Sequence, residues 1–539
     1  MKKTAQKLLS LLLAVTLLVA AVPVLTAFAA DSTPVVYIFG KQDIYKTDEN
    51  GNRVNMFDDG DYLNQLMDGA LPMIAKGALT GDWDEYVDHA LGVLLPAFEG
   101  FAMRPDGTLP EGTGILWSWN ESSLRPEYTL EGHPVYIFRP DSRLSPMVIA
   151  DQINDFISAV KRKTGAQKVI VASRCEGTAL ASAYVYKYEK DNGFAGLDKL
   201  ILINSSVNGV GYVDAMMTGN VVIEPKSAYR FLHNIDAYTK IFSETDTTLD
   251  EETLSLVSDI VEALHETYGI NLTAALLERM YGQLKDSFFA PLIRAYWGVS
   301  LAFVSCVNDH YEDYADYLFG DQKDVYANLI AQADDFHYNV QLHEAELLKD
   351  AEAAGVTVNV IVEYGIQQYP LSADSELIGD YMISVEKQSF GAKTCKLDET
   401  LSDAYIQERT EAGFGDYISP DRQIDASVGL FPDNTWYVKN LIHAFPWQLD
   451  LLEAETMQDG ASVRNTACGQ FLNYKPEEPR FVKAEAVNDN DYHFENEEPT
   501  GVKNVVDRLI ALFKRVIAYV KDIIAGIVGH AKGTVPPVE

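Results

Sequence analysis

The sequence has few basic residues and few cysteines, and each shortage excludes a class of protein. It contains 43 lysine and arginine residues against 79 aspartate and glutamate residues, a formal net charge of −36. Because such a chain repels phosphate, nucleic-acid binding through a broad basic surface is excluded. The four cysteines are widely spaced and form no Cys-x-x-Cys pair, so a zinc site has no support. They are Cys175, Cys306, Cys395 and Cys468.

Long apolar runs are also missing after the N-terminus. The nearest candidate, residues 291–304, is too short to cross a bilayer and contains Arg294. The N-terminus itself combines three lysines within its first seven residues, an apolar stretch over 8–21 and Ala-Phe-Ala at 27–29. This pattern predicts a signal peptide over residues 1–29, and hence a secreted or cell-envelope protein. An uncleaved anchor fits less well, because the apolar stretch is short.

The rest of the chain has the composition of a globular protein, with 47% apolar and 23% charged residues. Short runs of β-branched and aromatic residues predict buried strands at 35–39, 133–138, 168–172 and 199–204. Helical apolar spacing lies between the later strands, over 148–163 and 178–188. This alternation predicts an α/β fold with a mainly parallel sheet and helices on both faces.

After residue 212 the pattern becomes helical, with periodic apolar residues among acidic ones. Because strand-like residues resume at 356–364, we interpret this segment as a cap inserted into the core rather than a separate helical domain. The predicted order is a signal peptide (1–29), a first core part (30–212), a helical cap (213–353), a second core part (354–473), an acidic linker (474–501) and an amphipathic helix (502–530).

The turn between the third predicted strand and its helix is typical of a nucleophile elbow, which holds a nucleophile at a helix N-terminus. The usual pattern is Gly-x-Ser-x-Gly, and here the frame is Ser173-x-Cys175-x-Gly177. Gly177 keeps the close approach that such a turn requires. Ser173 lies two residues before the tip and would point into the sheet, so Cys175 is the candidate nucleophile.

Together with downstream motifs, this turn resembles the α/β-hydrolases of the secreted bacterial lipase and lecithin:cholesterol acyltransferase-like group. The resemblance covers roughly 34–212 and 351–475, and leaves out the cap and the tail. It rests on FRPDSRLSP at 138–146, the block KTGAQKVIVASRCEGTALASAY at 163–184, GDYMI at 379–383 and the segment from Asn434 to His443.

The resemblance implies a catalytic triad of Cys175 as nucleophile, Asp380 as acid and His443 as base. Asp380 stands in the Gly-Asp frame of GDYMI, and Asp374 is the second candidate for the acid. Nucleophile, acid and histidine follow one another in the order found in α/β-hydrolases. The other histidines precede the elbow or fall in the cap, the linker or the tail, which leaves His443 as the base.

The sequence departs from the family pattern at the elbow, where Cys175 replaces serine between Arg174 and Glu176. A helix N-terminus and an imidazolium both favour a thiolate, and Arg174 acts in the same direction while Glu176 opposes it. The alternative is a decayed site in which Cys175 is an inert buried thiol. Because the acid and base positions are still filled, we favour catalysis.

An acyl-transfer site also needs donors for the oxyanion. We expect the backbone N–H of Glu176 and one from the loop after Gly40, at Lys41 or Gln42. No metal or organic cofactor is implied.

The tail helix, 502–528, carries five basic and two acidic residues beside an apolar stripe. Such a helix suggests contact with a membrane surface. Packing on the acidic surface of the protein itself, or on a partner helix, is an equally good interpretation.

These observations predict a monomeric, secreted hydrolase or acyltransferase that acts on an ester or thioester. Aromatic residues of the cap suggest a bulky acyl, apolar or lipid-like substrate; they include Phe288, Phe289, Tyr296 and Trp297. The alternative is a catalytically decayed α/β-hydrolase-fold protein that binds a ligand in the same cleft.

Overall fold

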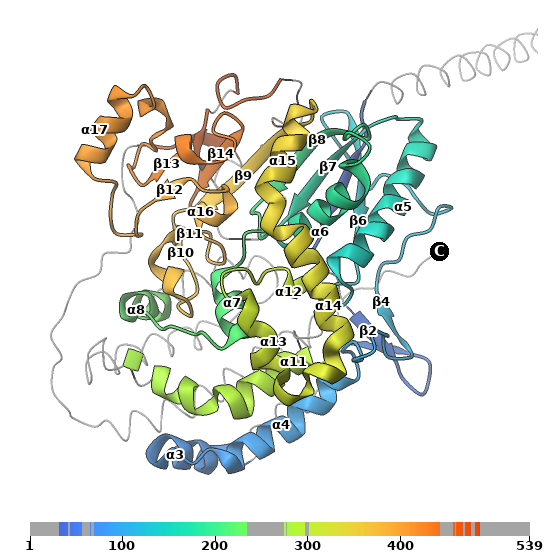
Figure 1. Cartoon of the computed structure of the whole chain (residues 1–539), viewed down its shortest axis with the longest axis vertical. Helices are drawn as coiled ribbons and strands as arrows, with labels where there is room; N and C mark the ends of the chain where they lie inside the picture. Colours follow the sequence, from blue (N-terminus) through green and yellow to red (C-terminus); the bar gives the residue numbers. More distant parts are fainter. Residues whose placement is uncertain are drawn as a thin grey trace, which may run out of the picture.

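Nine strands form the central sheet, and seven consecutive ones in its spatial order are parallel, with an antiparallel strand at each edge (Figure 1). The spatial order is β16-β15-β14-β9-β8-β7-β1-β6-β5. The bounds are β1 Val35–Ile38, β5 Tyr128–Leu130, β6 His133–Phe138, β7 Val169–Arg174, β8 Leu197–Ile203, β9 Thr357–Tyr364, β14 Thr435–Lys439, β15 Phe471–Lys475 and β16 Arg480–Lys483.

The computed structural model describes residues 32–40, 44–55, 69–233, 277–296, 301–441, 460–466, 469–475 and 480–485. It also describes the single residues Gln65, Ala274, Ala275, His443, Thr456 and Gln458. The predicted signal peptide and the tail helix 502–530 therefore lie outside the described residues, as do Lys41, Gln42, Trp297 and Cys468. None of the helices in the described ranges is both long and apolar enough to cross a membrane.

The central strands are buried on both faces, as their continuous apolar runs predict. Four helices pack on one face of the sheet in a single apolar core. They are α5 Pro146–Thr164, α6 Glu176–Tyr184, α14 Lys323–Asn339 and α15 Glu344–Ala353. Ser145 caps the N-terminus of α5 by accepting a hydrogen bond from the backbone N–H of Val148, and Gly165 ends the helix with a φ of 77°. The structure is thus an α/β fold with a mostly parallel sheet and flanking helices.

A helical layer lies beyond one end of the sheet, around α4, α11 and α13 (Figure 1). Its helices are α3 Ala70–Thr80, α4 Asp84–Glu99, α7 Gly211–Thr218, α8 Pro225–His233, α11 Ala290–Tyr296, α12 Leu301–Val304 and α13 Tyr311–Phe319.

The helical layer does not coincide with the predicted cap of residues 213–353. It includes helices that precede residue 213, and the last helices before residue 353 pack largely on the sheet instead. Trp83 and Val87 of the early segment pack against Leu284 and Phe288, which lie some two hundred residues later. Conversely, Phe336 of α14 packs in the core of the sheet, together with much of α15. Periodicity alone could not separate the two groups, because each has one apolar face and only the tertiary fold decides what that face contacts.

The second part of the core extends beyond its predicted end at Asn473. Strand β15 runs to Lys475 and pairs with β16, so residues 474–475 and 480–483 belong to the sheet rather than to the predicted acidic linker over 474–501. β16 is short and half-exposed at the sheet edge, and its alternation of polar and apolar residues is too brief to predict a strand.

Shorter elements connect these parts. They are β2 Ile44–Thr47, β3 Arg53–Asn55, β4 Thr113–Ile115, β10 Ile366–Gln367, β11 Ile378–Gly379, β12 Lys393–Thr394, β13 Ile424–Asp425, α16 Val385–Gln388 and α17 Asp403–Glu411.

One carboxyl group is buried where α15 meets α6. Oε1 of Glu344 accepts a hydrogen bond of 2.6 Å from the Ser182 hydroxyl, and its Oε2 has no hydrogen-bond partner among the described residues. Burial raises the pKa of Glu344 from 4.5 to about 7. The folded protein therefore keeps this proton at pH values where the unfolded chain has lost it.

This shift predicts a pH-dependent loss of stability. The contribution of Glu344 is complete below the pKa of the unfolded chain and is lost as the pH rises through about 7, a loss of about 3 kcal/mol. Glu344→Gln should thus reduce the fall in unfolding free energy between pH 5 and pH 8, measured by denaturant titration. Glu346→Gln, at an exposed position of the same helix, is the control and should behave like the wild type. If the unfolding free energy of Glu344→Gln falls with pH as steeply as that of the wild type, the prediction is wrong.

Candidate active site

The candidate residues meet at the carboxyl-terminal edge of the parallel strands, where open α/β sheets place their ligands. Cys175 follows β7, and Asp380 follows β11, the second of two short paired strands that come after β9 in the chain. His443 lies a few residues after β14. The structure therefore brings together the nucleophile, acid and base positions that the sequence predicts.

Cys175 occupies a strained turn between β7 and α6. Its φ of 49° and ψ of −129° lie in a region that residues other than glycine rarely adopt. The backbone N–H of Cys175 donates to the carbonyl oxygen of Ile203, and its own carbonyl oxygen accepts from the N–H of Thr178. These contacts fix the backbone on both sides of the thiol, which is half-buried.

Two glycines let the loop after β1 pass directly over this turn. A Cβ atom on Gly177 would lie 2.4 Å from the carbonyl oxygen of Ile38, and one on Gly40 would lie 2.7 Å from Cβ of Glu176. Gly40 and Glu176, both predicted for the oxyanion site, therefore adjoin. Glu176 is the first residue of α6, so its backbone N–H is among those that the helix leaves for other acceptors.

The Asp380 carboxylate is fully buried and holds His443 in place. Its Oδ2 lies 2.6 Å from Nδ1 of His443, and its Oδ1 accepts from the backbone N–H groups of Met382 and Ile383 at 3.0 and 2.8 Å. The backbone N–H of His443 also donates to the carbonyl oxygen of Asp380 at 2.8 Å. This geometry leaves Nε2 as the ring nitrogen for the Cys175 thiol.

The electrostatics of the site favour a charged imidazole. Burial by itself would lower the pKa of His443, but the adjacent Cys175 sulfur and the Asp380 carboxylate outweigh it and raise that pKa well above its ordinary value. A hydrogen bond between Cys175 and His443 acts in the same direction. The sulfur of the candidate nucleophile and a charged imidazole therefore lie side by side.

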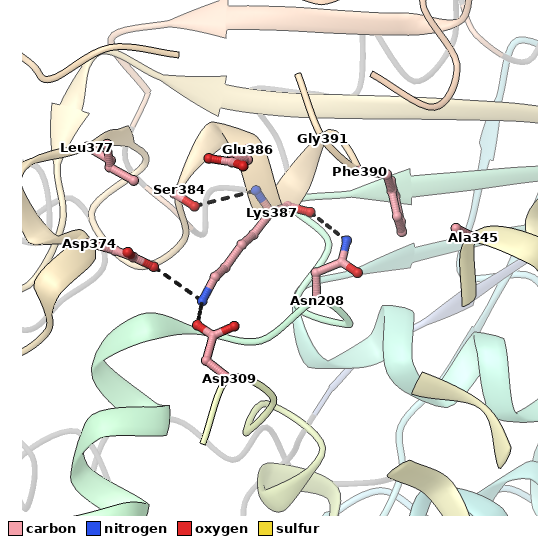
Figure 2. Close-up of a pocket in the computed structure, with 10 residues that line it drawn as sticks. All are labelled: Asn208, Asp309, Ala345, Asp374, Leu377, Ser384, Glu386, Lys387, Phe390 and Gly391. Carbon is pink, nitrogen blue, oxygen red and sulfur yellow. Dashed lines mark hydrogen bonds and ion pairs between the residues drawn. The ribbon is translucent and has the colours of Figure 1, made fainter. Parts of the chain in front are cut away.

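The alternatives to these residues lie elsewhere. Asp374 forms an ion pair with Lys387 at 3.3 Å in a cavity of about 430 Å³, and Figure 2 shows Lys387 directed between Asp374 and Asp309. Asp374 is therefore not the partner of His443. Ser173 is fully buried within β7, as expected for a residue that points into the sheet.

Sequence reasoning missed two polar residues of the site, Asn204 and Glu363. Nδ2 of Asn204 lies 3.0 Å from Oδ2 of Asp380 and 2.5 Å from Oε2 of Glu363. Oε1 of Glu363 lies 3.4 Å from Nη2 of Arg174. A signal was present for Glu363, because it is the one carboxylate within the apolar run VTVNVIVEY and a buried strand rarely carries an unpaired charge.

Glu363, Asp380 and His443 present possible ligand atoms within 4.8 Å of one another, the one such group in the described ranges. Their charges are already balanced by one another and by Arg174, and Nδ1 of His443 is engaged by Asp380. We therefore assign no metal to this group.

Aromatic side chains lie near the thiol, but Phe288 and Phe289, which the sequence suggested, are not among them. The side chains of Tyr296 and Trp297 lie outside the part of the chain that the structure describes. Phe288 and Phe289 pack inside the helical layer. Instead, the ring of Tyr369 lies 4.8 Å from that of Tyr212 and 4.2 Å from that of Tyr381, between their centroids. Burial, and the proximity of Tyr369 and Cys175, raise the pKa of Tyr212 well above its ordinary value. This aromatic row is therefore close to the candidate nucleophile.

Comparison with known proteins does not identify a family for this chain. No family model matches the chain, and no curated protein matches its sequence. A chain in a solved structure, the crystal structure of the Tle4–Tli4 complex, is 13% identical, with 62% of this chain and 75% of that chain covered. The TM-score is 0.22, which is too low to support an argument.

The close approach at the elbow predicts the effect of one added methyl group. Gly177→Ala should lower the free energy of unfolding by about 1–3 kcal/mol, because the Ile38 backbone cannot move away easily. The same substitution should also slow the alkylation of Cys175 by iodoacetamide. Peptide mass spectrometry measures the rate of that alkylation. Gly92→Ala is the matched control, since a Cβ there meets nothing within 4 Å and lies inside α4. If both variants match the wild type in stability and Cys175 reactivity, the close approach does not constrain the turn.

Proposed function

We propose that the protein is a hydrolase or acyltransferase that acts on an ester or thioester through a Cys175–His443–Asp380 triad. The observation that carries this proposal is the position of His443, which is fixed by the buried Asp380 and hydrogen-bonded to a thiol on a strained strand-to-helix turn. Nucleophile, base and orienting acid are the three parts that nucleophilic acyl transfer requires.

The reaction proceeds in two steps. The Cys175 thiolate attacks the carbonyl carbon and a C–S bond forms; the bond to the leaving group then breaks, and the His443 imidazolium gives that group its proton. In the second step, the oxygen of water or of an acceptor alcohol attacks the thioester, and His443 takes the proton from that oxygen. The acid or new ester leaves, and Cys175 returns as a thiolate beside a protonated His443.

Other parts of the site have supporting roles in this proposal. The backbone N–H of Glu176 and one from the loop after Gly40, at Lys41 or Gln42, hold the oxyanion. The row of Tyr212, Tyr369 and Tyr381 favours a substrate with a bulky acyl or other apolar group near the reacting carbonyl.

We further infer that the fold is that of an α/β-hydrolase, similar to the secreted lipase and acyltransferase-like group. Support comes from the parallel sheet and from the order in which nucleophile, acid and histidine follow its strands. The N-terminal pattern supports the proposal of a secreted or envelope-bound location. The basic and apolar residues of 502–528 support the proposal that this segment contacts a membrane surface.

Substitution of Cys175 tests the chemistry. Cys175→Ala should abolish hydrolysis of p-nitrophenyl and thioester substrates of increasing acyl length, whereas Cys175→Ser should retain part of it. Cys395→Ala is the matched control, because Cys395 is also half-buried but contacts the carbonyl oxygens of Glu399 and Gln423 instead of a histidine. Equal activity in the wild type and Cys175→Ala would place the chemistry elsewhere.

Thiol reactivity gives a test that needs no substrate. Iodoacetamide should label Cys175 well before Cys306 and Cys395 at pH 7.5, because burial raises the pKa of Cys395 to about 12 and that of Cys306 well above its ordinary value. If Cys175 reacts no faster than Cys395, the site is decayed and the protein is a non-catalytic binder.

The tail is tested by truncation after Glu485, which keeps β16 in the sheet. The shortened protein should still melt cooperatively, and it should bind anionic vesicles less than the full chain, by a difference that added salt reduces. Loss of the cooperative melt would mean that residues 486–539 are part of the core.

A further inference from the structure

Glu363 is a second carboxyl group beside the candidate triad, and the mechanism above does not use it. It lies near the carboxyl end of β9 and is only 1% exposed. Its possible ligand atom and those of Asp380 and His443 all lie within 4.8 Å of one another. A carboxyl group so placed affects the charge of both.

Asn204 connects the two carboxyl groups. It follows β8 with a φ of 48°, and its side chain is fully buried. The Nδ2 group has two hydrogens, and the acceptors within reach are Oε2 of Glu363 and Oδ2 of Asp380. One amide therefore holds both carboxyl groups, and a change at Glu363 is transmitted to the group that orients His443.

The charges that face Glu363 come from three other segments. Arg174 at the end of β7 contacts Oε1, and Asp380 and His443 lie on the side of Asn204. Other charged groups near β9 are engaged elsewhere: Lys387 of α16 pairs with Asp309 and Asp374 (Figure 2), and Lys439 of β14 pairs with Asp421.

Glu363 is poised between its two protonation states. Burial raises its pKa, Arg174 and His443 lower it, Asp380 raises it, and the resulting value is about 7. Below that pH the group is neutral, and above it the site carries a second buried carboxylate.

We propose that Glu363 is a positioning residue that acts through Asn204 on Asp380 and His443, and so sets the pH at which Cys175 becomes reactive. The inference rests on the proposed role of Cys175 as nucleophile. When Glu363 is ionised, its negative charge stabilises the protonated form of His443 and so raises the pKa of that imidazole. The imidazolium then favours the Cys175 thiolate, so reactivity gains a step as the pH rises through about 7.

The test is the rate of Cys175 alkylation by iodoacetamide from pH 5.5 to 9, measured on the full chain in the wild type and variants. The ratio of the wild-type rate to the Glu363→Gln rate removes the pH dependence that the two proteins share and leaves the part that Glu363 adds. We expect this ratio to rise roughly tenfold across pH 6–8, the effect of one pKa unit. Glu363→Asp keeps the charge and should restore the step.

Glu344→Gln is the matched control, because Glu344 is also fully buried with a pKa of about 7, but its hydrogen bond is to Ser182, two turns along α6 from Cys175. Its ratio to the wild type should stay flat.

Asn204→Ala gives a second test that does not depend on the folding of Glu363→Gln. The Asn204 side chain connects Glu363 to Asp380 and also lowers the pKa of Glu363, so its removal should make the step smaller and move what is left of it to higher pH. A flat wild-type to Glu363→Gln ratio, or an unmoved step in Asn204→Ala, overturns the inference while Cys175 remains the fastest thiol. If Cys175 instead reacts no faster than Cys395, the proposed function itself has failed.

Discussion

The buried carboxylate of Asp380 is the constraint on which most of the site depends. A charge without access to water requires several donors, and each donor ties another segment to the same place. Two come from the backbone of its own loop, one from Asn204 after β8 and one from His443 after β14. The donor requirement of one side chain thus joins the carboxyl ends of separate strands and fixes the imidazole that faces the thiol.

The helical layer helps to hold this arrangement in place. Ile383, whose backbone N–H binds Asp380, packs its side chain in the same apolar cluster as Val210, Val213 and Tyr311. The loop that carries the acid is therefore held between the sheet and the helices. A change of packing in the layer would be felt at the imidazole, because interiors are dense and transmit displacement.

The site concentrates opposite charges away from solvent. The carboxyl groups of Asp380 and Glu363 share the edge of the sheet with the cationic groups of His443 and Arg174. Arg174 contacts Glu363 through Nη2 alone, since its Nε and Nη1 have no hydrogen-bond partner in the described ranges. Buried ion pairs contribute little net stability, because desolvation cancels much of their attraction. Their consequence here is functional, since they determine which groups carry protons near neutral pH.

The sequence by itself determined the strands β1, β6, β7, β8 and β9, the helix after the elbow and the turn that places Cys175, because these depend on local patterns such as apolar runs and the Gly177 frame. It also indicated Asp380 and His443 through short motifs in a fixed order. The tertiary structure decided that Asn204 and Glu363 join them, that α3 and α4 pack with helices two hundred residues later, and that β16 completes the sheet. These features depend on contacts between segments far apart in the chain, and a local pattern shows that a face is apolar or a charge unusual without showing what will meet it.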